Sequence, residues 1–144
     1  MKLQIRSIQL EDARRIRELA EQLGYPATDQ ETESRITQCL SLQHNKAFVA
    51  IDDLEVVGWI YAFRSFSIES NSYVEIGGLV VDENHRGKGI GKQLIEKVKN
   101  WSLLQGIHEL RVRTNIRRVE SQSFYSSLGF QETKQQKVYN LSLQ

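Results

Sequence analysis

The residues most able to do chemistry lie in one glycine-rich stretch, from Leu79 to Lys92. It combines alternate glycines with cations: Gly87, Gly89, Gly91, Arg86, Lys88 and Lys92. Glycines allow a backbone to approach a ligand closely, and the first turn of a helix offers unpaired N–H donors with partial positive charge. An apolar strand that leads through this loop into a helix is therefore suited to bind phosphate or pyrophosphate.

Two common nucleotide-binding motifs do not match this spacing. A P-loop requires glycine, four residues, Gly-Lys and then Ser or Thr, but Gln93 follows Gly91-Lys92 and Arg86 stands where the first glycine belongs. The dinucleotide fingerprint Gly-x-Gly-x-x-Gly lacks its third glycine, whichever glycine of the loop is taken as the first. The alternative is a glycine-rich turn that only begins a helix, which leaves the three flanking cations unexplained.

Two ionisable side chains are candidates for proton transfer. Glu75 stands between Val74 and Ile76 in an apolar strand, where a carboxylate is costly unless it faces a cleft. Tyr125 lies in a short predicted helix, and a phenol with an ordinary pKa of about 10 is still protonated at neutral pH. The alternatives are a solvent-facing carboxylate at Glu75 and a packing aromatic ring at Tyr125.

Hydrophobic periodicity predicts the elements that position these residues. Strands are expected at 3–8, 47–51, 55–66, 72–81, 108–113, 130–133 and 137–143, and helices at about 13–23, 28–42, 89–105 and 119–128. Strands follow one another in the middle of the chain while helices separate them elsewhere, which predicts a mixed sheet with antiparallel central strands. Gly77-Gly78 predicts a bulge or a close backbone approach, with a glycine packed beneath a large side chain as the alternative.

Composition limits the other function classes. The 144 residues fit one domain that needs no disulfide or metal, and Cys39 with three histidines cannot form a four-ligand zinc site of the usual kind. The net charge of +1 gives no general reason to expect nucleic acid as a partner. The N-terminus has no apolar signal region and no run reaches membrane-spanning length, so we expect a cytoplasmic protein without a membrane partner.

Two motifs of this sequence together resemble those of a known family. The coenzyme A loop of the GNAT superfamily of N-acetyltransferases has the pattern Gln/Arg-x-x-Gly-x-Gly/Ala. The loop in this sequence resembles it, with Arg86, Gly89 and Gly91 at the three defined positions. The segment from Asn115 to Phe130 is similar to a second motif of that superfamily, with serine in place of the usual alanine at Ser121. The order of predicted elements matches along the whole chain. The resemblance implies one α/β (α+β) domain over residues 1–144, with about seven strands and about four helices.

The same resemblance implies acetyl-coenzyme A as acetyl donor and no metal. It implies cofactor contacts from the strand before the loop, from the loop itself and from a downstream asparagine: Leu79, Val80, Val81, Arg86, Gly87, Lys88, Gly89, Ile90, Gly91, Lys92 and Asn115. It also implies Tyr125 as the acid that protonates the departing thiolate and Glu75 as a possible base. Some members of the superfamily use an ordered water or another residue as the base.

The acceptor is less defined by the sequence. In the superfamily, the segments that correspond to 23–28 and 65–73 border the acceptor, and we expect a small-molecule amine there. A protein acetyltransferase acting on a lysine or an N-terminus, and an acyl-coenzyme A-binding module without catalysis, are the alternatives. The chain is expected to be a monomer or a homodimer, and nothing in the sequence identifies the amine.

Overall fold

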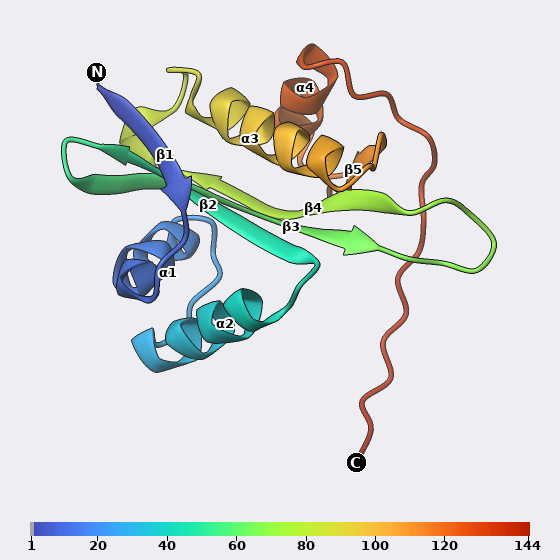
Figure 1. The fold of residues 1–144 in the computed structure, drawn as a ribbon, viewed down its shortest axis with the longest axis horizontal. Coiled ribbons are helices and arrows are strands. Elements are labelled where there is room, and N and C mark those ends of the chain that lie inside the picture. Colours follow the sequence, from blue (N-terminus) through green and yellow to red (C-terminus); the bar gives the residue numbers. More distant parts are fainter. Residues whose placement is uncertain (1) are drawn as a thin grey trace. The chain divides into compact units, whose positions relative to one another are not determined.

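The computed structural model describes residues 2–144 (Figure 1). Contacts divide them into two compact units, a first that ends at Arg113 and a second over Thr114–Gln144. Each unit is described by itself. The expected single acetyltransferase domain over residues 1–144 therefore stays a prediction.

The first unit is a five-stranded sheet with helices on both faces. Its strands are β1 (Leu3–Ser7), β2 (Asn45–Asp52), β3 (Glu55–Ser65), β4 (Tyr73–Val81) and β5 (Leu110–Val112). Its helices are α1 (Ala13–Glu21), α2 (Asp29–Ser41) and α3 (Ile90–Leu104), with short 3-10 turns η1 (Leu10–Asp12) and η2 (Glu83–His85). In Figure 1, α1 and α2 lie on one face of the sheet and α3 lies on the other.

The sheet is mixed, as predicted. Its order is β1-β2-β3-β4-β5, with antiparallel pairing throughout except between β4 and β5, which are parallel. The parallel connection runs through α3, because a crossover is required to bring the chain back to the same end of the sheet. This arrangement places the glycine-rich loop directly between β4 and α3.

The predicted count of about seven strands is wrong, because the structure has five strands and four helices in residues 2–144. The second unit contains α4 (Val119–Ser127), but the two strands predicted at 130–133 and 137–143 are not formed. Val138 is 92% exposed and Leu143 is 87% exposed. An alternating pattern becomes a strand only when a neighbouring strand or a packed face uses it, and these side chains have neither.

The core of the first unit has two layers. Between the sheet and the first two helices lie buried side chains from α1, α2 and the strands, among them Ile16, Leu19, Ile36 and Val49. On the opposite face the apolar side of α3 is buried, and Gly58 of β3 allows this helix to come close to the sheet. Both layers fix the position of β4, the strand that precedes the loop.

Candidate active site

The glycine-rich loop has the backbone conformation that its composition predicts. Gly87 has φ +78° and Gly89 has φ +81°, in the left-handed region that side-chain-bearing residues rarely adopt. A Cβ atom at either glycine would have no neighbour within 4 Å, so backbone conformation rather than space requires glycine there. Gly89 is the residue at which the chain turns into α3.

The first turn of α3 presents free N–H groups. The first helical hydrogen bond runs from Gln93 N to Gly89 O at 3.1 Å, and no side chain caps the helix. The N–H groups of Ile90, Gly91 and Lys92 therefore have no acceptor in the described part of the chain. Three such donors at the positive end of a 15-residue helix are an arrangement suited to binding an anion.

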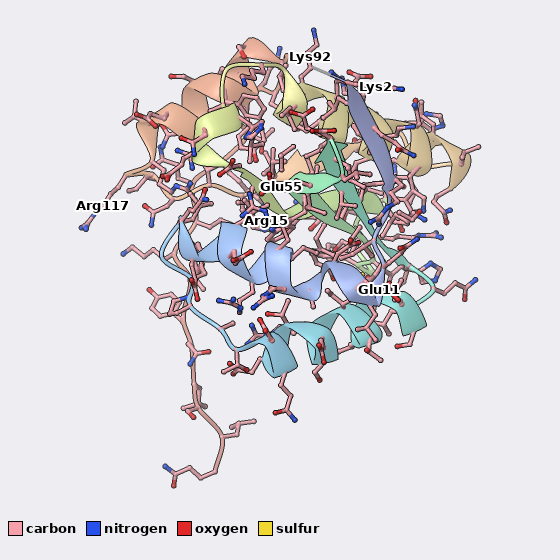
Figure 2. All side chains as sticks on the ribbon, turned by 90° about the vertical axis from the view of Figure 1, so that its left-hand side faces the viewer. Lys2, Glu11, Arg15, Glu55, Lys92 and Arg117 are labelled. Carbon is pink, nitrogen blue, oxygen red and sulfur yellow. The ribbon has the colours of Figure 1, made fainter. Side chains whose placement is uncertain are left out.

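Cations surround this helix end. Arg86, Lys88 and Lys92 are all exposed, and Lys92 projects from the surface in Figure 2. The Nε atom of Arg86 donates to Val81 O at 3.3 Å, which turns the arginine back toward the end of β4. The combination of peptide donors and mobile cations suits a diphosphate better than a single small anion, because the charge is distributed along the loop.

A buried carboxylate at the end of β4 holds the loop in place, and sequence reasoning did not identify it. Asp82 is 5% exposed; it accepts hydrogen bonds from Gln22 Nε2 at 2.9 Å and pairs with His85 Nδ1 at 2.7 Å. Arg15, which also pairs with Glu55 at 3.2 Å, lies 3.8 Å from Asp82 (Figure 2). Burial acts to raise the pKa of Asp82, but these partners outweigh it and lower the pKa. We call Asp82, Gln22, His85 and Arg15 the Asp82 cluster.

β4, the strand before the loop, has no neighbouring strand along part of one edge within residues 2–144. The β4–β5 ladder covers only Val74–Ile76 and Leu110–Val112, so beyond Ile76 the strand continues with pairing to β3 alone among the described strands. Gly78 lies opposite Tyr61 while Ile76 lies opposite Ala62, which leaves Gly77 as the extra residue of a bulge. The predicted bulge is confirmed, and it coincides with the end of the β4–β5 ladder.

The alternative interpretation of the paired glycines is confirmed as well. A Cβ atom on Gly77 would lie 2.8 Å from Cδ2 of Tyr61, and one on Gly78 would lie 3.0 Å from Cζ3 of Trp59. Aromatic rings of β3 therefore cover the two glycines on the face of α1 and α2, the face whose core cluster Trp59 and Tyr61 join. Both the bulge and the rings require the absence of a side chain at this point.

Glu75 lies next to the bulge and is paired with an arginine. Its Oε1 accepts from Arg113 Nε at 3.0 Å, and its side chain is 14% exposed. The charge of Glu75 raises the pKa of Arg113, so the arginine stays a cation beside this carboxyl group. The sequence indicated a partly buried carboxylate, but its partner is 38 residues away and carried no local signal.

Tyr125 belongs to the second unit, where aromatic rings enclose it. Phe124 lies 5.2 Å and Phe130 5.5 Å from the Tyr125 ring, both edge to face. Burial raises the pKa of the Tyr125 phenol, and the charge of Arg118 lowers it by less. The side chain is thus a packing aromatic as well as a phenol that stays protonated at neutral pH.

Asn115 forms a turn in the same unit. Its Oδ1 atom accepts from Arg117 N at 2.9 Å, which is the turn-forming role that the sequence left open for a loop asparagine. The predicted site residues are therefore divided: the strand, loop and Glu75 belong to the first unit, and Asn115 and Tyr125 belong to the second.

No group of three or more metal-ligating side chains occurs in residues 2–144. None of the helices described here has the length and apolar character that crossing a bilayer requires.

Comparison with known proteins gives consistent matches. The model of the acetyltransferase (GNAT) family matches residues 10–130. The aminoglycoside N(6')-acetyltransferase type 1 of Serratia marcescens is 30% identical over 115 residues, which cover 76% of this chain and 79% of that protein. The N-acetylaspartate synthetase of Xenopus tropicalis is 34% identical over 98 residues, which cover 67% of this chain but 35% of that protein.

Solved structures agree with the sequence matches. The aminoglycoside N-acetyltransferase AAC(6')-Iy in complex with coenzyme A has a TM-score of 0.88 and 25% identity, covering 99% of this chain and 96% of that one. The same enzyme with a bisubstrate analogue of coenzyme A and acetylneamine also has a TM-score of 0.88, with 99% and 100% coverage. Together with the loop, the free helix end and the opened strand, these matches show that the chain belongs to the acetyltransferase (GNAT) family, as an acetyl-coenzyme A-dependent N-acetyltransferase.

Proposed function

We propose that this enzyme acetylates the primary amine of a small molecule by direct attack on acetyl-coenzyme A, with Glu75 as base and Tyr125 as acid. The main support for the proposal is that three features follow one another directly along the first unit. They are, within the described residues, a strand with an unpaired edge, a loop with glycines in the left-handed conformation, and a helix whose first turn is not capped. These parts suit a donor with an amide-rich arm followed by a diphosphate.

Donor binding is assigned to three groups of residues. Leu79, Val80 and Val81 lie where β4 is no longer paired to β5, and the pantetheine arm is proposed to bind along this edge as an additional strand, through the peptide groups that point away from β3. The diphosphate is proposed to accept from the loop and helix residues Arg86, Gly87, Lys88, Gly89, Ile90, Gly91 and Lys92. Asn115 is proposed as a further contact through its side-chain nitrogen, because its oxygen already accepts from Arg117 N.

The chemistry requires three tasks of the protein. Glu75, which accepts a hydrogen bond from Arg113, is proposed to take a proton from the ammonium form of the acceptor, directly or through a water. Peptide N–H groups at the bulge are proposed to donate to the oxygen on which negative charge develops during attack. Tyr125 keeps its proton at neutral pH and gives it to the thiolate as the C–S bond breaks.

The proposed class of acceptor is based on the proteins to which this chain is similar. Acetyltransferases that are named for small amines, including aminoglycosides and aspartate, match this chain over two thirds of its length or more. We therefore propose a small-molecule amine ahead of a protein lysine or N-terminus. A binding module without catalysis would not need both the phenol of Tyr125 and the carboxyl group of Glu75.

The test is an acetylation assay with the purified chain. Release of free coenzyme A thiol is measured with a panel of mono-, di- and polyamines, amino acids and lysine peptides, and a small amine is expected to give the highest kcat/KM. Gly89→Ala should raise the KM for acetyl-coenzyme A at least about tenfold, since alanine at φ +81° is strained and displaces the N–H donors. Lys99→Ala, near the middle of α3, is the matched control and should leave that KM unchanged. Turnover of peptides alone, or binding of the donor with no turnover of any amine, would contradict the proposal.

A further inference from the structure

A second cluster of charged and aromatic side chains lies beside the bulge, on the face of the sheet that α1 and α2 occupy. Tyr61 packs against the core of that face, and Phe63 follows it on the same side of β3. Glu75 lies directly opposite Phe63, and Arg111 of β5 lies directly opposite Glu75. Paired residues project from the same face of a sheet, so the side chains of Glu75 and Arg111 are neighbours.

Arg111 is held by an aromatic ring alone. Its guanidinium carbon lies 3.9 Å from the centroid of the Tyr73 ring, and no hydrogen bond or ion pair engages it within the part of the chain described. Stacking fixes the plane of a guanidinium while leaving the N–H groups at its edge available. Glu109, two residues earlier on the strand, makes no ion pair with it and lies farther from the bulge.

The other members of the cluster are already engaged with one another. Arg113 donates to Glu75 at 3.0 Å and lies 3.5 Å from the Tyr73 hydroxyl through Nη2. Glu75 is thus shared between a base role and an ion pair with Arg113. Arg111, its neighbour across the β4–β5 ladder, makes no ion pair with a carboxylate of the described residues, so its positive charge is available to a ligand on this face.

The direction of approach links this cluster to the acceptor. On the opposite face of β4, Val74 and Ile76 are buried, and α3 packs against that side of the sheet, so an acceptor has no access there. An amine that gives its proton to Glu75 must therefore approach on the face that carries Arg111 and Arg113. A substituent a few bonds from that amine meets the guanidinium of Arg111.

We propose that the acceptor carries an anionic group, a carboxylate or a phosphate, close to its amine, and that Arg111 binds this group in bidentate fashion with support from Arg113. The inference rests on the proposed function, because it uses Glu75 as the group that the amine must reach. A planar guanidinium edge fits two oxygens of a carboxylate or phosphate. The same charges disfavour an acceptor whose other substituents are all ammonium groups, since like charges in a confined site repel.

The first experiment compares matched acceptors with the wild-type protein. The pairs are L-phenylalanine with 2-phenylethylamine and D-glucosamine 6-phosphate with D-glucosamine, and kanamycin A serves as the polycation. The acid-bearing member of at least one pair should have a kcat/KM higher by about tenfold or more, as expected for a hydrogen-bonded charge pair. The pair with the larger ratio distinguishes carboxylate from phosphate. Higher activity with the members that lack an acidic group in both pairs, or with kanamycin A, would overturn the inference.

The second experiment removes the guanidinium. Arg111→Gln should lower kcat/KM for the preferred acidic acceptor by about ten- to a hundredfold, mainly through KM, and leave kcat/KM for the counterpart without an acidic group nearly unchanged. Arg64→Gln is the matched control, because Arg64 is an exposed arginine on β3 that lies opposite Val74 on the other face. Arg111→Lys keeps the charge and should recover only part of the loss. Equal losses for both members of the pair would assign Arg111 a structural role and overturn the inference.

The outcomes separate the two proposals. If no amine of either kind is acetylated, the proposed function fails. If amines are acetylated without preference for an acidic group, the proposed function stands and only this inference fails. The melting temperature of each variant shows whether a loss of activity reflects unfolding.

Discussion

The phenol of Tyr125 has the property that an acid needs at neutral pH. Burial among Phe124 and Phe130 raises its pKa above the ordinary value of about 10, so the protonated form persists throughout the physiological range and beyond it. The same rings restrict its rotation. A side chain that is both neutral and fixed in direction can donate a proton without reorganising its surroundings.

Tyr125→Phe is expected to lower kcat by about a hundredfold, because the departing thiolate loses its proton donor. The KM for acetyl-coenzyme A and the melting temperature should change little, since the ring and its packing are retained. Steady-state assays with the best acceptor measure both constants, and Tyr139→Phe at an 86% exposed position is the control. A kcat unchanged by Tyr125→Phe would remove the acid assignment.

The proposed base, Glu75, differs from Tyr125 because its carboxyl group is already paired with another side chain. In the structure its carboxylate accepts from Arg113, and this contact must loosen or be shared when an ammonium group approaches. The side chain of Arg113 is 50% exposed, whereas that of Glu75 is 14% exposed. The proposed base role therefore requires the approaching ammonium group to share the Glu75 carboxylate with Arg113.

Glu75→Gln is expected to reduce kcat/KM for the acceptor by about a hundredfold, because an amide cannot accept the proton. Donor affinity, measured by titration with coenzyme A, should be unaffected. Arg113→Gln provides the comparison, since it frees the carboxylate while retaining it, and should cost less activity than the loss of Glu75. Full activity in Glu75→Gln would show that a water or another residue is the base.

Among the elements, the connection from β4 to α3 depends on the Asp82 cluster. Gln22, at the end of α1, contacts Asp82 with its nitrogen and accepts from Glu83 N at 3.0 Å with its oxygen. One side chain thus links the end of α1 to both residues that begin the loop. His85 adds a second contact immediately before Arg86.

The lowered pKa of Asp82 predicts how stability depends on pH. A carboxylate with a depressed folded-state pKa contributes stability above its unfolded pKa of about 3.9, and this contribution is lost as pH falls through the lower folded value. Asp82→Asn should lower the free energy of unfolding at pH 7 by about 1–3 kcal/mol and weaken its dependence on acid pH. Urea unfolding at pH 7 and pH 3 measures both effects.

The control for that prediction is Asp53→Asn, in the β2–β3 turn, where φ is +50° and asparagine is well tolerated. Asp82→Asn should also raise the KM for acetyl-coenzyme A, because the loop loses its attachment at the end of β4. Stability at pH 7 equal to that of the Asp53 variant would contradict the role of the cluster.

On the scale of the whole molecule, the segment after α4 stands out. Residues 137–144 have an alternating apolar pattern without strand pairing, and Leu141 is 82% exposed. Large exposed side chains gathered in one segment are unusual for a soluble chain, and they usually mark a contact surface.

Leu141→Ser with Leu143→Ser is expected to change the free energy of unfolding of the isolated chain by less than about 0.5 kcal/mol, because both side chains are exposed. Chemical denaturation at low protein concentration provides the measurement, with Ile60→Ser in the core as the destabilised reference. A large loss of stability in the tail variant would show that these residues are packed in solution.

Much of the site follows from local sequence. The spacing of Gly87, Gly89 and Gly91 predicted the loop and the start of α3 to within one residue, because left-handed backbone and helix capping are decided by adjacent residues. The bulge at Gly77-Gly78 and the antiparallel order of the central strands were also predicted. In each case the determining residues are neighbours in sequence.

The features that the sequence did not reveal depend on pairing between distant segments. Gln22 meets Asp82 across 60 residues, and Arg113 meets Glu75 across 38. Strand register decides which side chains on β4 and β5 become neighbours, and a one-residue shift would send each to the opposite face. The sequence by itself thus determined the glycine-rich loop and the family of the enzyme. Only the tertiary structure decided that the proposed base has an arginine partner, that a second arginine stacks on Tyr73 beside it, and that the last two predicted strands are not formed.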